Sequence, residues 1–258
     1  MARILYVDIE TSPHLAHVWG MWDQNVGLSQ LKKAGRIMGF AYRWKDGQKA
    51  RWVSEYDASV GESSDEKYLA MLEKAHQLYD EADIVVTYNG DRFDNLHFNA
   101  AWAMAGMTPP SPVQSIDLFS TVKRKLRFPS NKLDYVCKVL LGQRKVAHHG
   151  HQLWNECIDP DVDERTRAKA WRLMSRYARQ DVDLLQPLHE KLMPWLPNTV
   201  NVAIFGDDHD APACGRCGST DLERRGFAAT AAKVYQRFRC RSCGAWARGT
   251  AKVKWSIR

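Results

Sequence analysis

The sequence predicts an α/β fold: a mixed five-stranded sheet flanked by helices, joined to a small C-terminal metal-binding module. Short apolar stretches rich in β-branched and aromatic residues alternate with longer segments whose apolar residues recur at helical spacing, a pattern typical of a sheet covered by helices. The 258 residues, 45% of them hydrophobic, suffice for one ordinary domain and a smaller unit. Four of the six cysteines form two C-x-x-C pairs near the C-terminus, which is typical of a metal site.

The predicted strands and helices follow the chain in the order of a mixed sheet. The apolar run at residues 4–9 begins the sheet, and residues 36–44 and 50–56 form a hairpin around the turn-forming sequence KDGQ. Two further buried strands are predicted at residues 83–89 and 113–119. Helical spacing of apolar residues predicts four helical segments, at residues 63–82, 89–107, 131–142 and 163–196. Pro187 is expected to bend the last of these.

Positive charge is concentrated at the C-terminal end of the chain. The last 45 residues contain 11 of the 37 Lys and Arg residues but only 2 of the 30 Asp and Glu residues. The preceding part therefore carries slightly more acidic than basic residues, and the excess charge of +7 resides in the C-terminal segment. Such a segment usually binds a polyanion, most often nucleic acid; the alternative is a solvated basic tail.

The chain is expected to divide into a main domain at residues 1–205, a linker at 206–213 and a basic module at 214–258. The linker sequence GDDHDAPA is acidic and contains Gly and Pro. No stretch approaches the ~20 apolar residues of a membrane span, and Asp8 and Glu10 follow the N-terminus too closely for a signal-peptide core. We therefore expect a cytoplasmic protein without a membrane partner.

Two acidic residues interrupt the first apolar strand. Asp8 and Glu10 are two residues apart, so on a strand both carboxylates project from the same face. Two like charges repel each other, and burial makes each more costly. A divalent cation such as Mg²⁺ or Mn²⁺ bound between them would remove this repulsion, because hard cations prefer carboxylate oxygens. The alternative is an ordinary pair of charges on a surface strand.

A second acidic motif, NGDRFD, lies at a strand-to-helix junction. Asn89 ends the strand, and Phe93 and Asp94 enter the following helix. The Asp94 carboxylate can point across the edge of the sheet towards Asp8. The alternative is an ordinary cap at the start of the helix, a role that Asp91 can fill and so leave Asp94 free.

A third motif lies in the long C-terminal helical region. Tyr177 and Asp181 are four residues apart and share one helix face, whereas Asp183 should face elsewhere. A carboxylate beside a phenol can hold a metal ion while the hydroxyl group orients a water molecule. Taken alone, a Tyr and an Asp at this spacing are usually structural.

Together the three motifs resemble, in their order, the DEDD superfamily of 3′–5′ exonucleases, which has an RNase H-like fold. The chain matches its tyrosine-bearing branch, because Arg176 stands where the other branch requires histidine. The stretches NKLDYVCKVLLG and LWNEC also look like this family, especially its phage and bacterial members with a C-terminal zinc ribbon. The resemblance covers roughly residues 3–200.

The resemblance implies a site and an activity. It makes Asp8, Glu10, Asp94 and Asp181 the ligands of two Mg²⁺ or Mn²⁺ ions and Tyr177 the residue that orients the attacking water. The implied reaction is metal-dependent hydrolysis of the terminal phosphodiester of DNA, single-stranded or frayed, to nucleoside 5′-monophosphates. DNA is favoured over RNA, partners in replication or repair are implied, and the expected location is the cytoplasm of a bacterial cell or phage-infected host.

Nucleic-acid contacts are implied mainly by position. In this family the loop after the first strand touches the terminal nucleotide, which points to Thr11, Leu15 and Trp19; stacking by Trp19 on a base and packing of the loop are both open. Asn89 and Phe93 are expected to contact nucleic acid beside Asp94.

The cysteine module resembles a zinc ribbon. The pairs Cys214/Cys217 and Cys240/Cys243 enclose 22 residues, close to the spacing of known Cys₄ zinc sites, and a glycine follows each pair. Four thiolates favour a closed, structural Zn²⁺ site, which should contribute most of the stability of so small a module.

Three arginines of this module, Arg237, Arg239 and Arg241, alternate with other residues and should share one face of a strand. We expect them to hold the phosphate backbone without reading sequence.

Two alternatives to the exonuclease remain. One is an RNase H-fold endonuclease or junction nuclease, which would release oligomers rather than mononucleotides. The other is a catalytically inactive DNA-binding protein, against which the presence of all five expected site residues argues.

Overall fold

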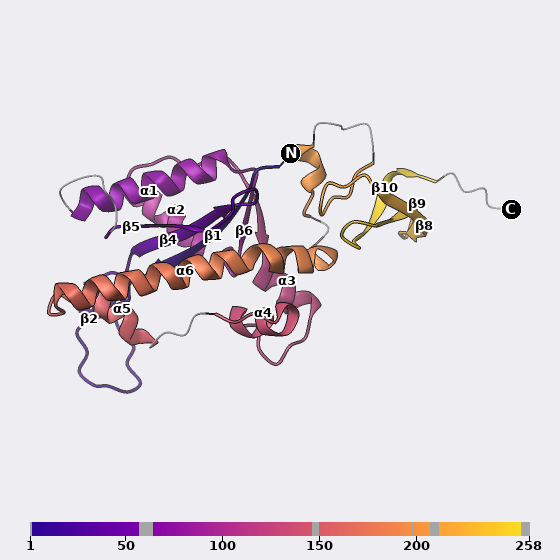
Figure 1. The fold of residues 1–258 in the computed structure, drawn as a ribbon. Helices are drawn as coiled ribbons and strands as arrows, with labels where there is room; N and C mark the ends of the chain where they lie inside the picture. Colours follow the sequence, from indigo (N-terminus) through magenta and orange to yellow (C-terminus); the bar gives the residue numbers. More distant parts are fainter. Residues whose placement is uncertain (1, 57–63, 146–149, 198, 207–211, 254–258) are drawn as a thin grey trace.

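The computed structural model describes residues 2–56, 64–145, 150–197, 199–206 and 212–253. Its main part is a five-stranded sheet with the strand order β5-β4-β1-β6-β7, between helical layers on its two faces (Figure 1). The C-terminal residues form a separate three-stranded sheet, β10-β9-β8. The predicted fold class, a mixed five-stranded RNase H-like sheet with helices and a small C-terminal module, is confirmed.

The main sheet is mixed. Its strands are β1 (Ile4–Thr11), β4 (Ile37–Trp44), β5 (Arg51–Ser54), β6 (Ile84–Thr87) and β7 (Gln114–Asp117). β1 pairs antiparallel with β4 and β4 with β5, as the predicted hairpin requires. β1 pairs parallel with β6, and β6 with β7. β1 is therefore the central strand and has neighbours of both directions.

Successive residues of β1 point alternately into two cores. Leu5, Val7 and Ile9 pack in the core under α1 (Ser64–Glu81) and α2 (Asp94–Met104). Ile4 and Tyr6 pack in the opposite core, against α6 (Glu164–Leu192). Because the side-chain period of a strand is two, Asp8 and Glu10 continue the row that faces α6.

The helices on the α6 side are completed by α3 (Leu118–Lys125), α4 (Leu133–Leu141) and α5 (His151–Ile158). The sequence predicts α4 and α6 but neither α3 nor α5. The strand predicted at residues 113–119 ends at Asp117, because the Asp117 side chain accepts a hydrogen bond from the backbone N of Ser120 and caps α3. α6 continues as one helix through Pro187, where a bend is predicted.

A long loop follows β1 on the same side of the molecule as α5 (Figure 1). At its base, β2 (Leu15–Ala16) pairs antiparallel with β3 (Leu31–Lys33), which a short 3₁₀ helix, η1 (Leu28–Gln30), precedes. These elements are not predicted by the sequence. The hydrogen bond from the backbone N of His17 to the carbonyl O of Gln30, 2.9 Å, closes the base of the loop.

The C-terminal module consists of β8 (Leu222–Ala229), β9 (Val234–Cys240) and β10 (Trp246–Lys252), all antiparallel. It packs on the main domain through its first cysteine turn. Arg216, 7% exposed, donates a hydrogen bond to the carbonyl O of Val200, and the backbone N of Val202 donates to the carbonyl O of Gly215 at 2.8 Å.

The predicted linker at 206–213 and the domain limits derived from it stay predictions, because residues 207–211 lie outside the described part of the chain. Among the described residues, no helix is both long enough and apolar enough to cross a membrane.

Candidate active site and metal centres

The five predicted catalytic residues lie around one pocket of about 200 Å³. Asp8 and Glu10 come from β1, Asp94 from the first turn of α2, and Tyr177 and Asp181 from the middle of α6. The structure thus brings together side chains that are 173 positions apart in the numbered sequence, from Asp8 to Asp181. The pocket is also lined by Ile9, Tyr88, Asn89, Phe93, Leu133 and Lys145.

Asp94 is fixed by the strand that carries the other two acids. Its Oδ1 accepts a hydrogen bond from the backbone N of Ile9 at 3.0 Å, and its side chain is buried. The N-cap of α2 is Phe93, so the capping role open to Asp91 is not observed; Asp91 instead accepts a hydrogen bond from Ser115 Oγ at 2.5 Å. The hydrogen bond from Ile9 uses one Asp94 oxygen, and the Asp94 side chain lines the pocket beside the acids of β1.

Asn89, at the rim of the pocket, has a left-handed backbone conformation with φ +76°. Its backbone N donates to Asp117 Oδ1 at 2.9 Å, and the same oxygen accepts from Ser120 N at 3.2 Å. Asp117 therefore both caps α3 and holds the turn between β6 and α2. A non-glycine residue in this conformation is costly, and the Asp117 contact stabilises it.

Tyr177 and Asp181 lie one turn apart on the face of α6 that meets β1, as predicted. Asp183 points away: it accepts hydrogen bonds from Arg43 Nη1 and from the backbone N of Ala50, both at 3.0 Å. The two aspartates, two residues apart on one helix, therefore have different environments: Asp181 is 2% exposed in the pocket, whereas Asp183 is 38% exposed beside Arg43 of β4.

Lys145 is a pocket residue that the sequence does not predict. Its ammonium group forms an ion pair with Asp181 and donates a hydrogen bond to the Tyr177 hydroxyl at 3.0 Å. Its backbone N donates to Asp134 Oδ1 of α4 at 3.0 Å, and the Gln180 side chain of α6 donates to the preceding carbonyl, Arg144 O, at 3.0 Å. These two contacts hold the segment after α4 over the pocket.

Trp154 of α5 is a second unpredicted neighbour of the site. Its side chain hydrogen-bonds Glu10, and its ring lies edge-on to Tyr177 with 6.2 Å between centroids. Because α5 packs against α6, the Trp154 indole contacts both Glu10 of β1 and Tyr177 of α6. The motif LWNEC, in which Trp154 occurs, is part of the family resemblance but assigns it no role.

Burial is the main cause that raises the pKa values of Asp8, Glu10 and Asp94. Burial, then Asp94 and Asp181, raise the pKa of Asp8 well above its usual range. Burial and the Asp181 charge raise the pKa of Glu10 to about 8, and burial raises the pKa of Asp94 to about 7 despite the hydrogen bond from Ile9. One lysine cannot neutralise four carboxylates, so the pocket has a deficit of positive charge that divalent cations with oxygen ligands would fill.

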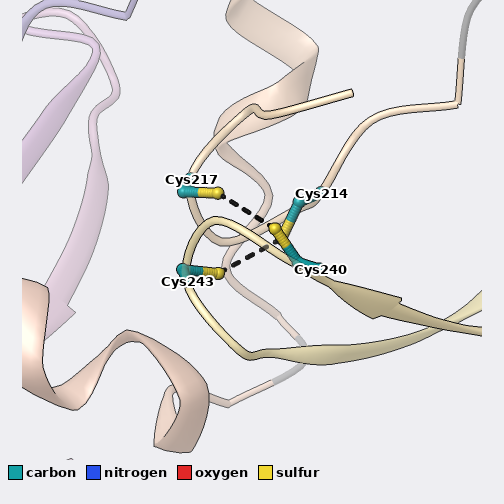
Figure 2. A group of neighbouring side chains, drawn as sticks. All are labelled: Cys214, Cys217, Cys240 and Cys243. Carbon is teal, nitrogen blue, oxygen red and sulfur yellow. Dashed lines mark hydrogen bonds between the residues drawn. The ribbon is translucent and has the colours of Figure 1, made fainter. Parts of the chain in front are cut away.

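The four cysteines form a different kind of site. Their ligand atoms all lie within 4.8 Å of one another, and they are the only described group of three or more potential His, Cys, Asp or Glu ligands this close together. Sulfur atoms from opposite turns approach to 3.6 Å, Cys214 to Cys243 and Cys217 to Cys240 (Figure 2). Four soft sulfur ligands at this separation fit a tetrahedral Zn²⁺ ion with no position left for water.

Each cysteine turn depends on a glycine in the left-handed conformation. Gly218 has φ +77° and Gly244 has φ +78°. Their backbone N–H groups donate to the carbonyl oxygens of Cys214 and Cys240 at 2.8 and 3.0 Å. The sequence pattern C-x-x-C-G therefore produces two equivalent turns that face each other.

A larger groove of about 890 Å³ opens from the carboxylate pocket. Tyr88, Asn89, Leu133, Lys145 and Tyr177 line both. The groove continues along α3 and α4 and is also lined by Phe119, Asn131, Lys132, Asp134 and Arg144. It combines aromatic rings with basic side chains, the combination that binds single-stranded nucleic acid.

Five of the residues predicted to contact nucleic acid belong to the main domain, where they lie at the carboxylate pocket or in the loop after β1. Asn89 and Phe93 line the carboxylate pocket, and Thr11 ends β1 next to it. Leu15 and Trp19 lie in the loop after β1, where Trp19 is 99% exposed and packs against nothing.

The three arginines of the cysteine module that are predicted to bind phosphate lie in two places. Arg237 and Arg239 share one face of β9, as predicted. Arg241 does not join them, because β9 ends at Cys240; it lies in the following turn, 3.8 Å from Asp221.

Residues 5–193 match the family model of the RNase H superfamily. No curated protein matches the chain. Among solved structures, the chain is similar to the family B DNA polymerase from the hyperthermophilic archaeon Pyrobaculum calidifontis, with a TM-score of 0.51 and 18% sequence identity. That match covers 75% of this chain but 25% of the polymerase chain, so it concerns the fold alone. The cysteine module lies outside the residues matched by the family model.

Proposed function

The chain belongs to the RNase H superfamily, and from this premise we propose that it is a metal-dependent 3′–5′ exonuclease. It would hydrolyse the terminal phosphodiester of single-stranded or frayed DNA and release nucleoside 5′-monophosphates. The observation that carries this proposal is the convergence of Asp8, Glu10, Asp94, Asp181 and Tyr177 on one pocket. Four oxygen donors that repel one another in a confined space are the ligand set expected for two Mg²⁺ or Mn²⁺ ions.

The carboxylates would hold the two ions, which supply charge stabilisation for in-line displacement at phosphorus. The chain's own groups then orient the reactants. The Tyr177 hydroxyl accepts a hydrogen bond from Lys145 Nζ, which holds it in place. It would accept a second hydrogen bond from the attacking water and so orient that water. The Lys145 ammonium contacts both Tyr177 and Asp181, and it would also bind a phosphate oxygen of a substrate held at the metal ions.

The groove beside the pocket supports a single strand as substrate. Tyr88 and Phe119, edge-on at 5.7 Å between centroids, offer aromatic surface, while Lys132 and Arg144 offer positive charge. Unpaired bases can stack on such rings, whereas paired bases cannot. A DNA substrate, replication or repair partners and a cytoplasmic location remain part of the proposal, and the C-terminal module, holding one Zn²⁺, would assist nucleic-acid binding.

A time course on 3′- and 5′-labelled DNA and RNA tests the proposal. Mg²⁺ or Mn²⁺ is omitted and restored rather than chelated, because a chelator would also remove zinc. We expect mononucleotides from the 3′-end from the first time points, and only with the added ion. Oligomeric products would indicate the endonuclease or junction nuclease, and no hydrolysis with retained binding would indicate the inactive DNA-binding protein.

A further inference from the structure

The three-stranded sheet of the C-terminal module has two unlike faces. Strand register places Tyr235, Arg237 and Arg239 of β9 on the same face as Trp246 and Arg248 of β10. We call these five residues the outer face. Arg237, Arg239, Trp246 and Arg248 are exposed, and Trp246 is 45% exposed.

The opposite face is turned towards the main domain. Leu222, Gln236 and Phe238 line a pocket of about 490 Å³ together with Ala203 and Ile204 of η3 (Val202–Phe205). Arg248 of β10 also lines this pocket, but the other four residues of the outer face are not part of its lining and remain available to a ligand.

The guanidinium groups of two outer-face arginines lie over aromatic rings. The guanidinium carbon of Arg237 lies 4.8 Å from the centroid of Trp246, and that of Arg248 lies 4.6 Å from the centroid of Tyr235. Arg237 Nε also donates to the carbonyl O of Arg225 at 2.9 Å. A guanidinium over a ring can still offer its second planar face and its remaining N–H donors to a ligand.

The positive charge of this face is not neutralised by the acid nearest to it. Glu223 is in register with Arg239, but its carboxylate pairs with Arg225 Nε at 3.3 Å. Cation–π pairs that only shielded a small core would leave their rings buried, yet the Trp246 ring remains nearly half exposed. Stacked rings, planar cations and unneutralised charge on one face match the chemistry that binds bases and phosphates together.

We propose that the outer face binds single-stranded nucleic acid, with bases stacked on the Arg237–Trp246 and Arg248–Tyr235 pairs and a phosphate at Arg239. The inference rests on the proposed function, since the bound strand would be the one digested at the carboxylate pocket. It adds a second contact region and a selectivity: paired bases expose no face for stacking, so duplex should gain little from the aromatic pairs.

The test is fluorescence anisotropy of labelled oligo(dT) and of a blunt hairpin duplex, with the full-length, zinc-loaded protein. The background is Asp8→Asn without Mg²⁺, so that no substrate is consumed. Trp246→Leu should weaken oligo(dT) binding roughly tenfold and duplex binding much less, because one base loses its stacking partner. Arg239→Gln should lower the slope of log affinity against log salt by about 0.7, as the loss of one phosphate contact requires.

Phe227→Leu is the matched control: Phe227 is an aromatic residue of the same sheet, 49% exposed, in register with Gln236 of the opposite face. Its oligo(dT) affinity should be unchanged. The proposal is overturned if Trp246→Leu behaves like Phe227→Leu, or if it weakens oligo(dT) and duplex equally.

Zinc content and circular dichroism verify that each variant is folded; if Trp246→Leu loses zinc, Tyr235→Leu tests the other stacking pair by the same criterion. Hydrolysis by the wild-type chain is measured separately. Strand binding by the outer face without hydrolysis would refute the proposed function alone, and hydrolysis without that binding would refute this inference alone.

Discussion

The cysteine cluster and the carboxylate pocket place potential metal ligands together in opposite ways. The cysteines come from two short turns joined by one hairpin, and their sulfur atoms lie within 4.8 Å of one another. The acids come from β1, α2 and α6, line a pocket and include a lysine among them. The first site is made by local backbone geometry, whereas the second exists only once the whole main domain has folded.

The two sites also differ in what the ligands cost the protein. The cysteines lie in a small core with Ala245, so the module has little apolar burial to stabilise it without metal. Four carboxylates cannot all ionise at low cost in one pocket, as the raised pKa values of Asp8, Glu10 and Asp94 show. We expect metal loss to unfold the C-terminal module, because zinc supplies most of the stability of so small a unit. Metal loss from the acidic pocket should leave the fold intact but the chemistry absent, because the two large cores of the main domain do not include the metal ligands.

The largest expected effect is on the cysteine site. Cys240→Ser removes one of four ligands, so the module should lose its zinc and its protease resistance, because structural zinc contributes roughly 10–16 kcal/mol in peptides of this kind. Zinc release per chain and limited proteolysis measure this. Ser242→Ala, which removes only the hydrogen bond between Ser219 Oγ and Ser242 Oγ, should keep zinc. A Cys240→Ser protein with full zinc content would refute the local-turn account.

A second test uses the two aspartates on α6. Asp181→Asn should lower kcat by more than about 10³-fold, because it removes a proposed ligand charge where reaction charge develops. Asp183→Asn, matched in chemistry and helix, should keep nearly full activity because its side chain faces Arg43 and Ala50. Equal losses in both variants would mean that the pocket is not the active site.

A third test concerns Lys145, which lines the acidic pocket and has no counterpart among the four cysteines described at the other site. Lys145→Met removes the donor to the Tyr177 hydroxyl and the ion pair with Asp181, and we expect kcat to fall about 10²-fold. Without Mg²⁺ the variant should also melt at a lower temperature, with the difference reduced when Mg²⁺ is added. Unchanged kcat would exclude Lys145 from the reaction, whatever happens to the melting temperature.

The smallest effect expected is on the pH dependence of stability. The folded-state pKa of Glu10, about 8, lies above the ordinary value of 4.5, so the folded chain binds more protons between these values. Stability without Mg²⁺ should therefore fall as pH rises through this window. The difference between wild type and Glu10→Gln, at most about 1.4 kcal/mol for each pH unit of this window, isolates the contribution in scanning fluorimetry. If the wild-type Tm instead rises relative to that of Glu10→Gln as pH increases from 4.5 to 8, the predicted fall in stability with pH is wrong.

The sequence predicts what is local in this molecule. Cysteine spacing followed by glycine predicts the cysteine cluster, and the i, i+4 spacing predicts that Tyr177 and Asp181 share a helix face. Apolar runs predict all five strands of the main sheet. The same local reasoning errs where an element ends early: Arg241 follows the last residue of β9, and Asp117 ends β7 to cap α3.

What the sequence does not predict depends on distant packing. Lys145 reaches the pocket because Asp134 and Gln180, on two different helices, hold the backbone around it. Trp154 reaches Glu10 because the short helix α5 packs against α6. Neither residue carries a local spacing or composition signal, so only the assembled fold identifies them.

Manganese anomalous scattering from crystals of the zinc-loaded chain, soaked in Mn²⁺ with a nucleoside 5′-monophosphate, tests the central claim most directly. We predict manganese bound among Asp8, Glu10, Asp94 and Asp181, with the Lys145 ammonium displaced from Asp181. Ordered nucleotide elsewhere, and no manganese in a pocket where Lys145 still pairs with Asp181, would contradict the account.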